Sequence, residues 1–128
     1  DIDHFKQIND LHGHQAGDEV LIKISQTVKT HLRVYDSIGR LGGDEFLVIA
    51  PVVDGEKCKN LFDRLLTTIA DCKIKFSTGE VTITASIGVA VASAEINEDQ
   101  LLDTADAAMY QAKRQGGNRV VYAPREES

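Results

Sequence analysis

The sequence lacks long apolar runs, an excess of positive charge and a framework of cysteines. No apolar stretch approaches the roughly 20 residues of a membrane-spanning helix, and the first residues do not have the pattern of a signal peptide. The 14 Lys and Arg residues face 20 Asp and Glu residues, which gives a net charge of −6. Proteins that bind nucleic acid over a wide surface are usually basic, so extended contact with DNA or RNA is not expected.

The only cysteines are Cys58 and Cys72. Two cysteines at this spacing fit neither a metal site nor a disulfide framework. Both fall in or beside one predicted helix, where a separation of 14 positions corresponds to about 21 Å and is too long for a disulfide. We therefore expect reduced thiols in a cytoplasmic domain. Segments upstream of this chain could still anchor the whole protein to a membrane.

The length of 128 residues fits one domain with a hydrophobic core. Apolar residues make up 42% of the chain and charged residues 27%, which places it among ordinary globular proteins. No repeat, linker or low-complexity segment divides the chain. We predict a single domain over residues 1–124, followed by a polar tail at 125–128.

Hydrophobic periodicity predicts the order of helices and strands. Apolar residues recur at helical spacing in the segments 4–12, 17–32, 55–71 and 97–114. Asp54 is a suitable cap for the third helix, and Asn97 with Gln100 resembles a capping box for the fourth. Strands are predicted at 36–41, 45–51, 81–91 and 119–123, with a turn at 77–79. This mixed order predicts an α+β fold.

The same patterns predict which side chains lie inside. Phe5, Ile8 and Leu11 are expected to face inward from the first helix. The strand 45–51 is apolar on both faces, as in a buried central strand. The strand 81–91 alternates between larger apolar residues and small ones such as Gly88. Another element is therefore expected to pack closely on its small face.

The most informative part of the chain is Arg40-Leu41-Gly42-Gly43-Asp44-Glu45-Phe46. Glycine accepts positive φ, so Gly42 and Gly43 predict a tight turn between two strands. The glycines leave the backbone open to a ligand, and the acids Asp44 and Glu45 beside them are suited to bind a hard cation. An ordinary exposed hairpin tip has a similar composition, so the hairpin alone leaves both interpretations open. Its features together describe a place for a metal-bound phosphate.

Further motifs follow one order along the chain. They are Asp1-Ile2-Asp3-His4-Phe5-Lys6, then Asn9-Asp10 with Gly13-His14 and Gly17-Asp18, the hairpin run, Ser86-Ile87-Gly88-Val89-Ala90, and Ala105-Asp106-Ala107-Ala108-Met109-Tyr110-Gln111-Ala112-Lys113. In this order they resemble the GGDEF family, the diguanylate cyclases, over essentially the whole chain. The resemblance implies a ferredoxin-like nucleotidyl-cyclase fold, with a central, mainly antiparallel sheet flanked by helices. Asp1–Asp3 would then be the end of a first strand, whose body is missing together with an N-terminal helix.

The resemblance also implies an activity and its partners. Two GTP molecules would condense to cyclic di-GMP and two pyrophosphates, with one GTP bound by each subunit of a homodimer. The cofactor would be Mg²⁺ or Mn²⁺, with two ions per active site, because such ions clamp a triphosphate and activate a hydroxyl. An upstream sensory domain in the parent protein would be a further partner.

Roles for individual residues follow from the same resemblance. Asp1, Asp44 and the Ile2 carbonyl would bind the metal ions, and Asp44 and Glu45 would be the catalytic acids. The phosphates would be contacted by the turn glycines, by two lysines and by amides at the start of a helix. The guanine would be read by an asparagine and an aspartate, with a leucine packed on the base. The predicted substrate-binding residues are His4, Phe5, Lys6, Asn9, Asp18, Leu21, Gly42, Gly43 and Lys113.

Some of these residues also have structural interpretations. Taken alone, Lys6 and Lys113 could be ordinary surface lysines. Asn9 and Asp18 could be helix caps. Asp3, with Asp10, is expected to be structural and to pair with nearby bases. The surrounding structure has to decide between these interpretations.

A second site is predicted at Arg33-Val34-Tyr35-Asp36. This segment resembles the family's inhibitory R-x-x-D motif, in which an arginine fork binds a phosphate or guanine of the product and the acid binds guanine. Arg64 falls where a second arginine contributes in the family. The resemblance therefore implies feedback inhibition by cyclic di-GMP at Arg33, Asp36 and Arg64.

Three alternative functions stay open. A domain of this family could bind GTP or cyclic di-GMP as a sensor without catalysis, could form a mixed purine product, or could serve only for dimerisation. The intact hairpin acids argue against the sensor, and Asp18 argues for guanine. One departure is Gly117, which stands where many members carry an arginine and so removes one expected phosphate contact. Arg114 and Arg119 are the candidates to replace it.

Overall fold

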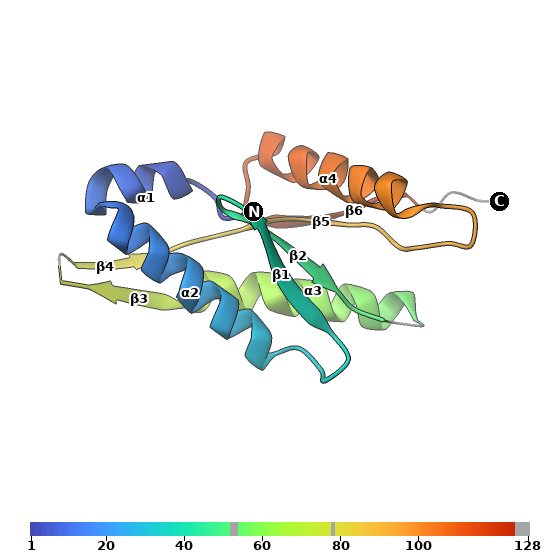
Figure 1. Ribbon diagram of the computed structural model, residues 1–128, viewed down its shortest axis with the longest axis horizontal. Helices are drawn as coiled ribbons and strands as arrows, with labels where there is room; N and C mark the ends of the chain where they lie inside the picture. Colours follow the sequence, from blue (N-terminus) through green and yellow to red (C-terminus); the bar gives the residue numbers. More distant parts are fainter. Residues whose placement is uncertain (52–53, 78, 125–128) are drawn as a thin grey trace.

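The computed structural model describes residues 1–51, 54–77 and 79–124 (Figure 1). The predicted tail 125–128 and Thr78, in the predicted turn, lie outside the described residues. The elements are α1 (Phe5–His12), α2 (His14–Thr30), β1 (Ser37–Gly42), β2 (Glu45–Ile49), α3 (Gly55–Asp71), β3 (Lys73–Phe76), β4 (Gly79–Thr82), β5 (Ser86–Val89), α4 (Glu98–Arg114) and β6 (Arg119–Tyr122). This order of helices and strands confirms the predicted α+β class.

Strand pairing is antiparallel in two places and parallel in one. β1 pairs with β2 and β3 pairs with β4 in antiparallel hairpins, whereas β5 pairs with β6 in parallel. Ile2 forms an antiparallel bridge with Ala85, just before β5. The segment Asp1–Asp3 therefore lies beside residues 84–86 through a single bridge and belongs to none of the named strands.

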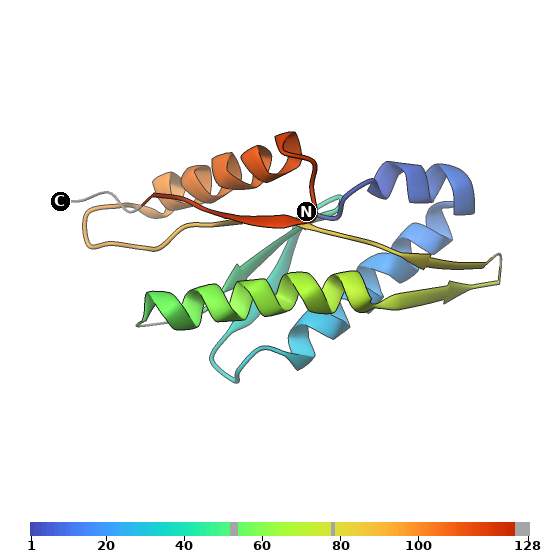
Figure 2. The same cartoon turned by 180° about the vertical axis from the view of Figure 1, so that it is seen from behind.

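The helices cover the strands from two sides. α4 lies along β5 and β6, and α2 and α3 lie on the other side of these strands (Figures 1 and 2). Leu65 of α3 and Val20 of α2 are among the largest fully buried side chains. Each large aliphatic side chain buried in this way contributes about 1.5–3 kcal/mol. The core helices bury apolar stripes at helical spacing, namely Val20, Leu21, Ile24 and Val28 on α2 and Leu61, Phe62, Leu65 and Ile69 on α3.

The starts of α3 and α4 are fixed by the side chains that the sequence identified. The Asp54 carboxylate accepts a hydrogen bond from the Glu56 amide at 2.8 Å. Asn97 and Gln100 form a complete capping box, with bonds of 2.8 and 3.1 Å between each side chain and the other residue's amide. A cap of this kind typically stabilises a helix by about 1 kcal/mol.

The small side of β5 admits α4 at close range. A Cβ atom on Gly88 would lie 2.1 Å from the Ala105 carbonyl oxygen and 2.2 Å from the Met109 amide nitrogen. Ala108 and Ala112 of α4 are buried. The predicted close packing is confirmed, and only a glycine fits at position 88.

Two predictions about the strands were wrong. The predicted strand 81–91 is divided into β4 and β5, because the chain leaves β3 after Thr82 and pairs with Ile2 at Ala85 and then with β6. Its predicted end, Val91, lies beyond β5 and is 40% exposed. The predicted central strand, β2, is only half-buried and its Ile49 is 57% exposed, because in the described ranges β1 is its one paired strand.

The helix predictions also needed correction. α1 packs on the core through Phe5 and Ile8, as predicted, but Leu11 is 79% exposed because it lies off that face. The second helix begins at His14, earlier than predicted, because Gly13 adopts a positive φ of 90° and joins α1 directly to α2. Glycine takes such a φ without steric cost.

The two cysteines lie in α3 and directly after it, as the sequence predicted. Cys58 is buried on α3 and Cys72 directly follows that helix. In the part of the chain that the structure describes, neither cysteine forms a disulfide. Within the same ranges, no helix combines the length and the apolar character that crossing a membrane requires.

Candidate functional site

The residues predicted to bind metal meet where the chain start passes the tip of the β1–β2 hairpin. The Ile2 amide donates a hydrogen bond to the Asp44 carbonyl at 3.3 Å. On its other side, Asp1 exchanges two backbone hydrogen bonds with Ser86, at 3.0 and 2.9 Å. These contacts bring Asp1, Ile2 and Asp44 together between the hairpin and β5.

The corner residues of the hairpin turn are Gly43 and Asp44, whereas the sequence predicted Gly42 and Gly43. Gly42 is the last residue of β1 and pairs with Glu45 across a register shift. Gly43 has a left-handed φ of 51°, and its carbonyl accepts a hydrogen bond from Arg40 Nε at 2.8 Å. A Cβ atom on either glycine would meet nothing within 4 Å. The backbone of the turn is therefore open to an approaching ligand, as predicted.

The carboxylate of Asp1 is buried and only partly satisfied. Its side chain is 2% exposed, and Oδ2 forms an ion pair with Nζ of Lys113. Oδ1 is buried and has no hydrogen-bond partner among the described residues. A buried carboxylate oxygen without a donor is unfavourable, and a bound cation would satisfy it. Lys113 is therefore not an ordinary surface lysine, because it neutralises an acid of the site.

The acids near Asp1 fit a small oxygen-liganded cation. Asp44 lies beside Ile2, and Asp44 and Glu45 are half-buried. Within the described ranges, no group of three or more His, Cys, Asp or Glu residues is placed to hold a metal ion. Mg²⁺ commonly takes one or two carboxylates and completes its shell with water and substrate phosphates. The chemistry of Asp1, Asp44 and the Ile2 carbonyl fits this kind of ion.

Asp3 is buried and accepts several hydrogen bonds beside the site. Its donors are the hydroxyls of Ser86 and Thr84 and the amide of Asn118, at 2.6, 2.7 and 2.8 Å. Burial alone raises the pKa of Asp3, but the hydrogen bonds from Ser86, Thr84 and Asn118 outweigh it and bring this pKa below its usual value. As expected, Asp3 makes structural hydrogen bonds within the domain, and the nearby base His4 also interacts with it electrostatically. Its donors are neutral, and they come from distant parts of the chain that a local pattern does not reveal.

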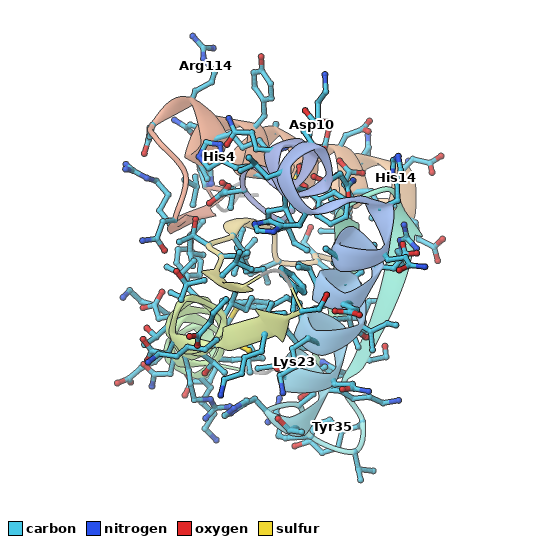
Figure 3. The ribbon with its side chains drawn as sticks, turned by 90° about the vertical axis from the view of Figure 1, so that its left-hand side faces the viewer. His4, Asp10, His14, Lys23, Tyr35 and Arg114 are labelled. Atoms are coloured by element: carbon cyan, nitrogen blue, oxygen red, sulfur yellow. The ribbon has the colours of Figure 1, made fainter. Side chains whose placement is uncertain are left out.

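The start of α1 presents unpaired amides and an exposed lysine. His4 precedes the helix with a left-handed φ of 58°, and its carbonyl accepts from Gln7 and Ile8 at 3.1 and 3.3 Å. The amides of Phe5 and Lys6 therefore belong to the first turn, where N–H groups lack intrahelical partners. Lys6 is exposed and forms no ion pair in the described part of the chain. Figure 3 shows His4 on the same side of the molecule as Arg114, far from Tyr35.

The residues predicted to read guanine lie where α1 meets α2. Asn9 Oδ1 is buried without a hydrogen-bond partner and faces Gly17, where a Cβ atom would lie 1.8 Å from it. Asp18 follows Gly17 on α2 and is exposed. Both lie inside helices whose caps are other residues, so the alternative interpretation of them as caps was wrong. Leu21 is 5% exposed and packs in the hydrophobic core, which does not support a contact with a base.

The predicted inhibitory residues come together at the loop after α2. Asp36 Oδ2 accepts from the Arg33 amide at 2.8 Å and from Arg33 Nε at 3.2 Å, and the Asp36 side chain is 0% exposed. The Arg33 guanidinium lies 4.6 Å from the centroid of the Tyr35 ring. From α3, Arg64 Nη2 donates to the His31 carbonyl at 3.2 Å. Arg33 and Asp36 thus bind each other, and Arg64 contacts the same loop.

Two surface hollows lie elsewhere on the molecule. One of about 390 Å³ lies between α2 and β3, and one of about 370 Å³ lies between α4 and the end of β6. Neither is lined by a residue predicted for the metal, the substrate or the inhibitor.

Together these features define an α+β domain with a carboxylate site beside an open glycine turn. Residues 1–119 match the family described as "Diguanylate cyclase, GGDEF domain". The chain is 41% identical over 123 residues to diguanylate cyclase DgcP of Pseudomonas aeruginosa, which covers 96% of this chain and 18% of that protein. This chain belongs to the GGDEF family, as its motifs indicated.

Solved structures support the same assignment. The chain is similar to the crystal structure of the diguanylate cyclase SiaD in complex with its activator SiaC from Pseudomonas aeruginosa, with a TM-score of 0.92, 36% identity, and coverage of 96% of this chain and 47% of that one. It is also similar to the GGDEF domain of DgcB from Caulobacter crescentus in complex with c-di-GMP, with a TM-score of 0.90, 31% identity, and coverage of 96% and 74%. The ferredoxin-like GGDEF fold predicted from the sequence is therefore confirmed.

Proposed function

We propose that this domain is a diguanylate cyclase, which condenses two GTP molecules to cyclic di-GMP and two pyrophosphates. The observation that carries the proposal is the buried Asp1 carboxylate beside the Gly43–Asp44 turn, with one oxygen lacking a partner. The chain spans about a fifth of the curated relative DgcP. The activity of the whole protein, and an upstream sensory domain that would control it, are therefore part of the proposal.

In the proposed reaction, the 3′-oxygen of one GTP attacks the α-phosphorus of the other. A bond forms between this oxygen and phosphorus, the bond from the α-phosphorus to the bridging oxygen breaks, and pyrophosphate leaves. The same step in the opposite direction closes the ring. Reactions of this class depend on positioning and on neutralising charge. Two Mg²⁺ or Mn²⁺ ions would supply that charge and acidify the attacking hydroxyl.

The residues of the chain would bind and orient the reactants. Asp1, Asp44 and the Ile2 carbonyl would bind the ions, and Glu45 would assist by binding metal or by accepting the hydroxyl proton. Lys113, which pairs with the Asp1 carboxylate, would contact a phosphate on the same ion. The open backbone of Gly42 and Gly43 lets a triphosphate approach without a steric clash.

The remaining substrate contacts would come from the first two helices. The amides at the start of α1, after His4, and the exposed Lys6 would bind phosphate oxygens. Asp18 can accept hydrogen bonds from N1–H and the 2-amino group of guanine, which adenine does not offer in that form. Asn9 would complete this recognition after its amide turns away from Gly17. The buried position of Leu21 leaves Asn9 and Asp18 as the proposed reading residues.

A homodimer is part of the proposal. Each domain would bind one GTP, and the reacting hydroxyl and phosphorus would come from different subunits. Membership of the GGDEF family supports this arrangement. Exclusion of water would then depend on the second domain.

Product inhibition is proposed at Arg33, Asp36 and Arg64. The supporting observation is that all three lie at one exposed loop. The relative DgcB has been crystallised with c-di-GMP. Since Arg33 and Asp36 bind each other, cyclic di-GMP would have to replace the Arg33–Asp36 contact with its own phosphate and guanine groups.

The test is an incubation of the full-length protein with GTP and Mg²⁺, followed by chromatographic separation of the nucleotides. Cyclic di-GMP is expected from the native protein and not from the Asp44→Ala variant. The matched control is Asp103→Ala, which removes an exposed acid of α4 and is expected to leave product formation unchanged. Binding of GTP or cyclic di-GMP without turnover would instead support the sensor function, to which the glycine at position 117 also points.

A further inference from the structure

Asp3 makes three side-chain hydrogen bonds directly beside the proposed cation site. Oδ1 accepts from the Ser86 hydroxyl, and Oδ2 accepts from the Thr84 hydroxyl and the Asn118 amide. Asp3 is 9% exposed and Ser86 is 0% exposed. We refer to Asp3, Thr84, Ser86 and Asn118 as the Asp3 cluster. A carboxylate has about four acceptor positions, so few remain for any further ligand.

The Asp3 cluster joins the parts of the chain that carry the proposed site. Thr84 and Ser86 flank the bridge between Ala85 and Ile2, and the Asp3 amide also donates to the Thr84 carbonyl at 2.9 Å. Asn118 lies in the loop that follows α4, the helix that carries Lys113. The carboxylate therefore connects the chain start that carries Asp1 and Ile2 to the loop behind Lys113.

The loop after α4 is shaped to meet this carboxylate. Gly117 and Asn118 both have left-handed conformations, with φ of 74° and 50°. A Cβ atom on Gly117 would lie 2.8 Å from Asp3 Oδ2 and 3.0 Å from Asp3 Cγ. Residues other than glycine seldom adopt a left-handed conformation. At Asn118 this conformation directs the amide to Asp3, and the hydrogen bond between them stabilises it. The close approach of Asp3 also accounts for the glycine at position 117.

We infer that Asp3 is a positioning residue for the proposed cation site. Its carboxylate fixes the place of Asp1 and the Ile2 carbonyl and, through Asn118, the place of Lys113, without binding a cation itself. The inference rests on the proposed function, because it concerns the same site. Partners of this kind orient metal ligands, and their loss commonly weakens metal binding ten- to a hundredfold.

The main test replaces Asp3 with asparagine in the full-length protein. Asparagine has nearly the same volume as aspartate, but an amide nitrogen replaces one of the two carboxylate oxygens. This nitrogen cannot accept a hydrogen bond from the donors of the Asp3 cluster. We expect Mn²⁺ binding in the presence of a non-hydrolysable GTP analogue to weaken about ten- to a hundredfold, measured by electron paramagnetic resonance titration. Thr84→Val and Ser86→Ala each remove one hydrogen-bond donor to Asp3. Each should weaken Mn²⁺ binding less than Asp3→Asn does. The charge control, Asp103→Asn, should bind Mn²⁺ as the native protein does.

A second measurement separates positioning from general loss of stability. Ile69→Val removes a methylene group from the core and lowers the melting temperature without touching the site. This variant should keep native Mn²⁺ affinity, whereas Asp3→Asn should lose affinity even where it melts at the same temperature. Without metal, hydrogen exchange of the Asn118 amide should be faster in Asp3→Ala than in Ile69→Val, because Asp3→Ala removes both oxygens that could accept from this amide.

The outcomes distinguish this inference from the proposed function. Native Mn²⁺ affinity in Asp3→Asn, or equal affinity loss in Ile69→Val, would overturn the role of Asp3. A native protein that binds Mn²⁺ with the analogue but forms no cyclic di-GMP would overturn the proposed catalysis and leave the Asp3 measurement valid. A native protein that binds no Mn²⁺ under these conditions would overturn both.

Discussion

Lys113 and Asp1 form an ion pair that joins the last turn of α4 to the chain start beside the hairpin. The Asp1 side chain is 2% exposed and the Lys113 side chain is 39% exposed. The lysine therefore neutralises a buried acid when no cation is bound. A residue proposed to contact phosphate thus also contributes to the stability of the domain.

Replacing Lys113 with methionine should destabilise the domain, because it leaves the buried Asp1 carboxylate without its cation. Removing one partner of a fully buried pair costs about 3–5 kcal/mol. Since Lys113 is partly exposed, water screens the pair, and we expect a loss of about 1–2 kcal/mol in the free energy of unfolding. Urea denaturation measures this loss. Mg²⁺ with a GTP analogue should restore part of it, because a cation would take over the charge.

The matched control for Lys113 is Lys59, which forms a surface ion pair with Asp63 at 2.8 Å on α3. Both side chains of that pair are well exposed, at 65% and 44%. Lys59→Met should change the stability by less than about 1 kcal/mol and should not respond to Mg²⁺. An equal loss of stability in the two variants would contradict a special role of the Lys113–Asp1 pair.

Replacing Gly88 with alanine should disrupt the packing of α4 on β5. The added methyl group would meet backbone atoms of Ala105 and Met109, which cannot move as a flexible side chain can. Overpacking typically costs about 1–3 kcal/mol, and we expect the upper end of that range in urea denaturation. Gly39→Ala on β1 is the control, since a Cβ atom there meets nothing within 4 Å. A loss for Gly88→Ala no greater than that for Gly39→Ala would show that α4 can shift away.

The features predicted correctly from the sequence depend on local chemistry. The caps Asp54 and Asn97 act on amides within a few residues of themselves, so a short motif reveals them. Gly88 was identified from the alternation of one segment. The meeting of Asp1 with Asp44 was predicted from the resemblance to a family rather than from any pattern within the chain.

The features that were missed depend on contacts between distant segments. Asp3 bonds Thr84, Ser86 and Asn118, which lie 81, 83 and 115 positions away, so no local spacing marks them as partners. The division of the strand 81–91 arises because Ala85 pairs with Ile2. Leu21 falls on the buried face of α2, within the segment 17–32 whose apolar residues recur at helical spacing.

Replacing Arg33 with alanine should weaken inhibition by cyclic di-GMP. The change removes the fork proposed to bind the ligand, and charge-assisted hydrogen bonds of this kind contribute about 1.5–3 kcal/mol. The concentration for half-maximal inhibition should rise at least about tenfold, measured from initial rates of GTP conversion at increasing cyclic di-GMP. The neighbouring Val34 is 102% exposed, so Val34→Ala should leave the inhibition curve unchanged. An unchanged curve for Arg33→Ala would eliminate the proposed inhibitory site.

Tyr122 should make the stability of the domain fall at alkaline pH. Its hydroxyl donates to Asp63 Oδ1 at 2.8 Å, and burial together with this bond raises the pKa of Tyr122 above its usual value of 10.0. Above about pH 10 the unfolded chain loses the Tyr122 proton, while the folded chain keeps it. The contribution of Tyr122 to the free energy of unfolding is therefore present at lower pH and is lost as pH rises. The loss is at most about 1.4 kcal/mol per pH unit. Urea denaturation of the native protein and Tyr122→Phe between about pH 9 and 11 measures the difference, which should shrink as pH rises. Tyr110 is 61% exposed, so the stability of Tyr110→Phe should vary with pH as that of the native protein does. If the stability of Tyr122→Phe also ran parallel to the native curve, titration of Tyr122 would not affect stability.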